Sequence, residues 1–141
     1  MRFMIMVKAT PDSEAGKWPE PVALEKLMGE MAAYHEDLAK AGVLLDGAGL
    51  WPSSKGWRIR YSGKNRQVID GPFAETKELI AGYTLIQVRS REEALEWSRR
   101  FPNPVQEGAD CEIEVRQLYD VDDLPAPTEA LSQRFKDVGL Q

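Results

Sequence analysis

Cysteine and histidine are scarce in this 141-residue chain, which contains one of each, Cys111 and His35. A single cysteine excludes an internal disulfide and a metal cage built from cysteines. It fits a reducing compartment, so we expect a cytoplasmic protein. A lone histidine cannot form a multi-histidine metal centre, and we therefore predict that the chain holds no metal.

Long apolar runs and clusters of basic residues are missing as well. No run approaches the roughly 20 residues that cross a bilayer, and the apolar opening, residues 1–7, is too short for a signal-peptide core. The chain has 18 Lys and Arg residues against 23 Asp and Glu, a net charge of −5. Because no basic stripe is present to neutralise phosphates, we expect neither nucleic acid nor a membrane as a partner.

Common catalytic and cofactor-binding motifs are also absent. The chain contains no phosphate-binding glycine loop, no G-x-G-x-x-G after a strand and no G-x-S-x-G turn. A Ser-His-Asp triad can be written from Ser53 or Ser54 with His35 and Asp70, but nothing in the sequence favours it. We therefore predict that the protein uses no cofactor.

The apolar pattern predicts four main strands. Residues 3–7 and 82–88 are apolar on both faces, which is typical of central strands. Residues 43–50 predict a strand weakened by glycines, at an edge or a bulge, and residues 111–115 predict a strand that is apolar on one face only. Alternation in residues 57–61 and the return over 67–69 predict a hairpin inserted before the third main strand.

Two helices separate these strands. The first is expected over residues 21–41 and ends at Gly42, while the second begins after a capping box of Ser90 and Glu93. Residues 10–20 contain two prolines and a glycine, so we expect a loop there. The resulting order matches a ferredoxin-like βαββαβ fold of the α+β class, in which the first and third main strands lie in the middle of the sheet.

The chain is expected to divide into a domain over residues 1–118 and a tail over residues 119–141. The tail is acidic, then contains Pro125 and Pro127, and ends in a short amphipathic segment. An isolated helix of this length is marginal in water, so we expect it to dock on another surface, with a second subunit as one candidate.

Residues 70–78, Asp-Gly-Pro-Phe-Ala-Glu-Thr-Lys-Glu, are the densest run of constrained and ionisable residues. Asp70 follows a strand and can cap a turn, and Pro72 restricts both its own φ and the residue before it. One interpretation is a rigid connection held down by Phe73. The other is the rim of a site that presents Asp70, Glu75 or Lys77 to a ligand.

This nonapeptide resembles the signature of the YCII-related, or DGPF-domain, family. Shorter similarities cover most of residues 1–118, and include Gly49-Leu50 followed by Pro52-Ser53, and Gly82-Tyr83. The resemblance implies a ferredoxin-like domain that pairs into a dimeric α/β barrel, so we expect a homodimer. Related YCII proteins carry a His/Asp pair in a cleft, and some DGPF proteins are associated with extracytoplasmic-function sigma factors. The resemblance does not assign that pair to His35 and Asp70.

His35 lies within the apolar stripe of the first predicted helix, at helical spacing from Met28 and Met31, and should be partly buried. It is either a hydrogen-bonded core residue or, if it faces a cleft beside Asp70, a general base oriented by a carboxylate. The catalytic candidates are therefore Asp70, His35 and Glu75. The candidates for substrate binding are the side chains Lys77, Ser53, Arg58 and Tyr83.

Three functions follow from these features. The first is a homodimer that binds a small organic ligand and performs cofactor-free acid–base chemistry. The second is a non-catalytic ligand-binding or regulatory module, associated through the resemblance with sigma-factor-dependent transcription. The third is an interaction protein that acts through its dimer and tail.

Overall fold

The computed structural model describes residues 1–125 and 128–141. A four-stranded antiparallel sheet, in the order β2-β5-β1-β6, contains the strands β1 (Arg2–Lys8), β2 (Leu44–Gly49), β5 (Ile80–Gln87) and β6 (Ile113–Gln117). A separate hairpin pairs β3 (Trp57–Ser62) with β4 (Asn65–Asp70). The described helices are α1 (Pro11–Glu14), α2 (Pro21–Lys40), α3 (Arg91–Arg99) and α4 (Glu129–Asp137), with short 3-10 turns η1 (Ser53–Lys55), η2 (Thr76–Glu78) and η3 (Val121–Asp123).

This strand order confirms the ferredoxin-like α+β fold. The first and third main strands, β1 and β5, are central, and they pair antiparallel with Phe3 opposite Ile86 and Ile5 opposite Thr84. The glycine-weakened strand β2 lies at an edge, and its pairing with β5 shifts register between Leu44 and Asp46. Both the edge position and the irregularity agree with the sequence pattern.

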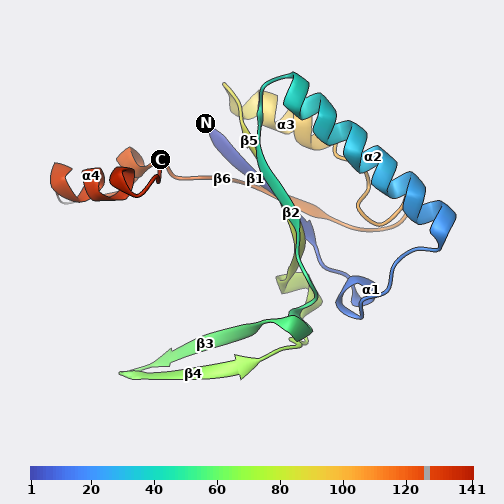
Figure 1. Cartoon of the computed structure of the whole chain (residues 1–141), viewed down its shortest axis with the longest axis horizontal. Helices are drawn as coiled ribbons and strands as arrows, with labels where there is room; N and C mark the ends of the chain where they lie inside the picture. The colour runs from blue at the N-terminus through green and yellow to red at the C-terminus, as the bar shows by residue number, and fades with distance from the viewer. Residues whose placement is uncertain (126–127) are drawn as a thin grey trace.

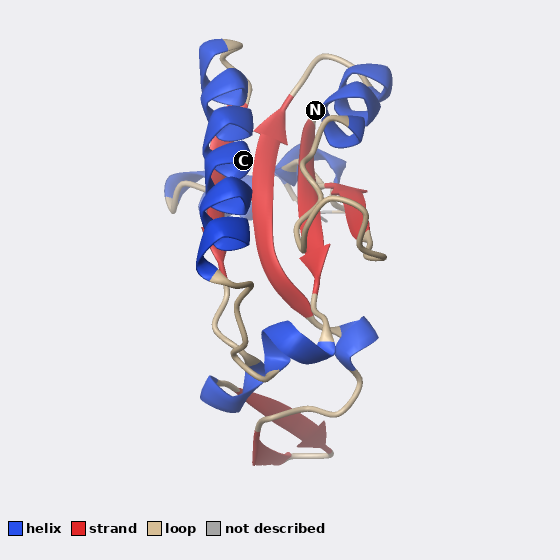
Figure 2. Cartoon of the chain, turned by 90° about the vertical axis from the view of Figure 1, so that its right-hand side faces the viewer, coloured by secondary structure: helices blue, strands red, loops and turns tan. Residues whose placement is uncertain are grey.

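Helices α2 and α3 cover one face of the sheet (Figures 1 and 2). The apolar core lies between these two helices and the sheet. It consists of Phe3, Ile5, Tyr34, Leu38, Val43, Ile86, Val88 and Ala94. The Tyr34 hydroxyl donates a 2.7 Å hydrogen bond to the Trp97 carbonyl and so joins the two helices. Burial raises the pKa of Tyr34 to about 12, because the charged phenolate would lose its hydration.

The opposite face of the sheet is covered by neither α2 nor α3. Met4 pairs with Leu85, and Met6 pairs with Tyr83, so these four side chains share that face. All four are half-buried. We call this surface, defined by Met4, Met6, Tyr83 and Leu85, the open face.

The loop predicted over residues 10–20 is partly wrong, because Pro11–Glu14 form the short helix α1. Thr10 caps this helix: its hydroxyl accepts from the Ser13 N–H at 3.1 Å, and the Ser13 hydroxyl accepts from the Thr10 N–H at 2.9 Å. The signal was present in the sequence, since Thr before Pro is a favoured start for a helix. The prolines and the glycine of the segment obscured it.

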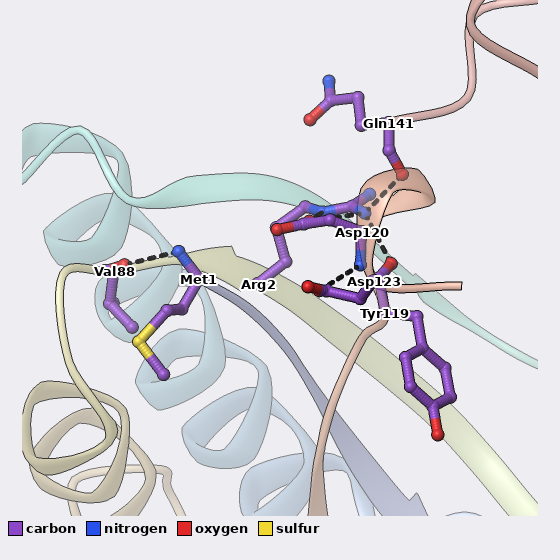
Figure 3. Close-up of polar contacts among 7 residues, drawn as sticks. All are labelled: Met1, Arg2, Val88, Tyr119, Asp120, Asp123 and Gln141. Carbon is purple, nitrogen blue, oxygen red and sulfur yellow. Dashed lines mark hydrogen bonds and ion pairs between the residues drawn. The ribbon is translucent and has the colours of Figure 1, made fainter. Parts of the chain in front are cut away.

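The tail folds back onto the start of β1 through Arg2 (Figure 3). The Arg2 guanidinium donates to the backbone oxygens of Tyr119 and Gln141, each at 2.9 Å, and pairs with the Asp120 carboxylate at 3.1 Å. Helix α4 is also held to η3 by a 2.8 Å ion pair between Lys136 and Asp122. The tail therefore contacts its own domain, while Pro127 lies outside the described residues.

Candidate functional site

The connection from β4 to β5 over residues 70–78, here called the signature turn, packs tightly against the loop around Ser53. The Gly71 N–H donates to the Gly56 carbonyl at 3.0 Å. A Cβ atom on Gly71 would lie 1.9 Å from the Ser53 carbonyl oxygen, so no other residue fits without moving the backbone. The Gly71–Pro72 peptide bond is cis.

Ser53 ties the signature turn to α1. Its backbone N–H donates to a Glu14 carboxylate oxygen at 2.9 Å, and its hydroxyl donates to the other. The Phe73 N–H in turn donates to the Ser53 hydroxyl oxygen at 3.0 Å. Sequence reasoning named Ser53 but missed Glu14, because α1 was interpreted as loop and no motif marks this glutamate.

Arg58 lies at the same corner. Its guanidinium carbon is 3.8 Å from the centre of the Phe73 ring, which places the cation over the ring face. Lys77 belongs to the signature turn, and two further candidates for substrate binding, Ser53 and Arg58, contact it. Both are already engaged by the turn itself.

The ionisable candidates of the signature turn point outward. Asp70 is exposed and stands opposite Trp57 at the base of the hairpin, and Glu75 and Lys77 are also exposed. Within residues 1–125 and 128–141, no side chain or backbone group makes a hydrogen bond or ion pair with the carboxylates of Asp70 or Glu75 or the Lys77 ammonium group. The turn is fixed by its backbone and by Ser53, which leaves these charges free to meet another molecule.

His35 lies elsewhere, between α2 and the sheet, and is partly buried as predicted. Its Nδ1 is 2.7 Å from the Met31 carbonyl oxygen, and its Nε2 is 2.8 Å from the Thr84 hydroxyl. Because a carbonyl only accepts, Nδ1 must carry the proton, and in the neutral ring Nε2 accepts from Thr84. Both ring nitrogens are occupied, and in the described chain no hydrogen bond or ion pair joins His35 to Asp70.

Tyr83, the last candidate, belongs to the open face. Its hydroxyl donates to the Asp46 carboxylate at 3.0 Å. This hydrogen bond, together with the negative charge of Asp46 and partial burial, raises the pKa of Tyr83. The candidates thus fall into three places: the signature turn, the helix-covered core and the open face.

Two shallow hollows lie away from all of these residues. One, of about 400 Å³, is lined by α2 and the loop near Glu107, where Lys26 forms a 3.1 Å ion pair with Glu107. The other, of about 330 Å³, lies between the end of β6 and Asp123. Among the residues that the structure describes, no group of three or more His, Cys, Asp or Glu is placed to hold a metal ion. No helix in the same ranges is long and apolar enough to span a membrane.

The chain is similar to known proteins. The family model of the YCII-related domain matches residues 1–119. An uncharacterized protein of Rhizobium meliloti (strain 1021) is 34% identical over 102 residues, which cover 72% of this chain and 82% of that protein. A solved structure of 5-chloro-2-hydroxyhydroquinone dehydrochlorinase from Burkholderia phenoliruptrix AC1100, in complex with 2,5-dihydroxybenzoquinone, shows 13% identity and a TM-score of 0.41. The match covers 85% of this chain and 95% of that one.

Proposed function

Because the chain belongs to the YCII-related domain family, we propose that it forms a homodimer that binds a small organic ligand beside the signature turn. One observation carries this proposal. The turn is held by Gly71 and by the bonds that link Ser53 to Glu14 and Phe73, while the charged groups of the turn remain unengaged. A rigid backbone that presents free polar groups is the arrangement that a binding site requires.

The dimer is supported by the open face. Four apolar or aromatic side chains, defined above, lie on a sheet surface that neither α2 nor α3 covers. Antiparallel sheets commonly expose one face to solvent, but that face then carries polar residues. On the open face the apolar centre is flanked by Asp46 of β2 and by Glu114 and Arg116 of β6. Such an apolar centre is buried when two sheets pack together, as in a dimeric α/β barrel.

Proton transfer in this site falls to Asp70, with Glu75 as the second carboxylate. Asp70 is exposed, and its carboxylate makes no hydrogen bond or ion pair within the described chain, so it can accept a proton from a bound ligand. Lys77 supplies a positive charge for an anionic substrate. We propose that this chemistry requires no cofactor. We also propose a cytoplasmic location, which cell fractionation with an antibody tests directly.

A non-catalytic ligand-binding or regulatory module is the second candidate, including one linked to sigma-factor-dependent transcription. Its support comes from His35, whose two ring nitrogens are hydrogen-bonded to Met31 and Thr84. The single histidine is therefore not free to exchange protons with a ligand in this state. Under this proposal, a ligand binds at the signature turn and leaves unchanged.

The deciding experiment screens a panel of small organic acids and lactones for thermal stabilisation and for turnover, with Asp70→Asn compared against wild type. If Asp70 contacts the ligand, the substitution removes about 1–3 kcal/mol of binding, a loss of at least fivefold in affinity. Asp110→Asn is the matched control, because Asp110 is also exposed and lies in the loop before β6, outside the signature turn. Turnover lost in Asp70→Asn supports acid–base chemistry, and binding without turnover supports the regulatory module. Full binding and turnover in Asp70→Asn would exclude Asp70 from the site.

A further inference from the structure

The β3–β4 hairpin, residues 57–70, projects from the sheet with one face unpartnered. Its register places Trp57, Ile59 and Tyr61 on one side, with Val68 directly opposite Ile59. These four large side chains remain 64%, 40%, 65% and 62% exposed. The same side also carries Asp70 opposite Trp57 and Arg66 opposite Tyr61, so an apolar centre lies between two charged residues. The other side is mostly polar and includes Arg58, Arg60 and Gln67.

An isolated two-stranded hairpin is at best marginally stable in water. This one is attached to the domain at its base, where Gly71 donates to Gly56 and Arg58 stacks on Phe73. The rest extends beyond the sheet (Figure 1). An amphipathic ribbon with such an uncovered face gains stability by packing that face against another surface.

The charge of the hairpin indicates what that surface is. Residues 57–70 contain four basic side chains, Arg58, Arg60, Lys64 and Arg66, and one acidic side chain, Asp70, a net charge of +3. The whole chain carries −5, which leaves −8 on the remainder. A second copy of this chain therefore offers a complementary, strongly acidic body to each hairpin.

The position of the hairpin agrees with this occupant. In Figures 1 and 2 it extends on the side of the sheet away from α2 and α3, the side of the open face. Tail helix α4 lies on the same side. A second copy that packs on the open face would thus come within reach of the hairpin.

We infer that the β3–β4 hairpin is an arm that packs its apolar face, Trp57, Ile59, Tyr61 and Val68, against a second copy of the chain. This inference rests on the proposed dimer and adds a contact that stabilises the dimer. The signature turn then has a second consequence, since the Arg58–Phe73 stack that shapes the candidate site also sets the direction of the arm.

The test compares dimer dissociation constants from analytical ultracentrifugation for wild type, for Tyr61→Ser combined with Val68→Ser, and for Gln67→Ser. Truncating two buried apolar side chains should weaken the dimer by roughly 10- to 100-fold. Gln67→Ser, an exposed neutral change on the opposite face, should leave the constant unchanged. Raising the salt concentration should also weaken the wild-type dimer, because the arm and the body carry opposite charges.

Hydrogen exchange supplies a readout that does not depend on the variants. The amides of residues 57–70 should exchange slowly above the wild-type dissociation constant and rapidly below it. A wild-type dimer that is unaffected by Tyr61→Ser with Val68→Ser, and whose arm exchanges rapidly, overturns this inference and leaves the proposed dimer intact. A wild-type chain that stays monomeric overturns both. Tight binding of random duplex DNA that is lost in Arg60→Ser would show that the arm serves a different occupant.

Discussion

Gly71 is the residue at which the signature turn leaves no room for a side chain. A Cβ atom there would meet the Ser53 carbonyl at 1.9 Å, whereas a Cβ on Gly56 in the same loop would meet it at an ordinary 3.6 Å. Ser53 also anchors Phe73 and Glu14, so any shift at Gly71 is transmitted to the whole corner.

We predict that Gly71→Ala lowers the free energy of unfolding by about 1–3 kcal/mol, as expected when a close-packed site is overfilled. Gly56→Ala should change it by less than about 0.5 kcal/mol, because the new methyl group has space. Both substitutions replace glycine with alanine, so much of the effect on the unfolded chain cancels in their difference, and the steric effect at Gly71 dominates what remains. Urea unfolding measures the free energy of unfolding of each variant. Equal stability of the two variants would contradict the close contact at Gly71.

For single residues, the sequence predicts which side chains are candidates for the site better than it predicts the contacts that these side chains make. Asp70, Ser53 and Arg58 could be named from pattern and resemblance, and Ser53 and Arg58 do meet at one corner. Glu14 could not, because its role depends on a contact with Ser53, 39 positions away, that no local pattern encodes. The hydrogen bond between His35 and Thr84 could not be predicted either, since Thr84 belongs to a strand that is distant in the sequence.

At the scale of elements, Arg2 makes the polar contacts that attach the tail to β1, and Val121 of η3 is buried as well. Arg2, whose side chain is only 13% exposed, binds backbone or carboxylate oxygens of Tyr119, Asp120 and Gln141 (Figure 3). Bonds from a charged donor contribute more than neutral ones, about 1.5–3 kcal/mol each. The exposed apolar side chains of the tail, Phe135 and Val138 among them, add little within one protomer.

We predict that Arg2→Met releases the tail without unfolding the domain. Amides of residues 128–141 should exchange with solvent at least roughly tenfold faster, since one lost charge-assisted bond exceeds the 1.4 kcal/mol that this factor requires. Arg116→Met is the control, because Arg116 makes only a 3.5 Å surface pair with Glu114. Amides of β1 and β5 should be unaffected in both variants. Unchanged exchange in the tail of Arg2→Met would show that other contacts hold it.

Elements with strong periodicity could be predicted, and those with weak signals could not. The 20-residue helix α2, both central strands and the hairpin follow from apolar spacing and turn residues. The four-residue α1 escaped because one turn of helix has no periodicity to detect. The predicted end of the domain at residue 118 stays a prediction, as do the roles of the site residues.

At the scale of the molecule, one face of the sheet is left without a partner. The apolar pattern of β1 and β5 on both faces indicates burial on both sides, yet α2 and α3 cover only one. The fold of a single chain thus explains the apolar residues on the helix-covered face of β1 and β5, which is half of the apolar pattern. The remaining half, the open face with Met4, Met6, Tyr83 and Leu85, is explained if a second copy supplies the missing layer.

A dimer of this kind makes stability depend on protein concentration, because unfolding separates the two copies. We predict that the wild-type melting temperature rises by about 2 °C for each tenfold increase in concentration, given the unfolding entropy of two chains of this length. Met6→Glu places a charge in the open face, and its melting temperature should be lower and independent of concentration. Val22→Glu, an equivalent change at an exposed site on α2, should retain the wild-type dependence. A concentration-dependent melting temperature in Met6→Glu would mean that the copies associate through another surface. The apolar character of the open face would then have to be explained by a different ligand or partner.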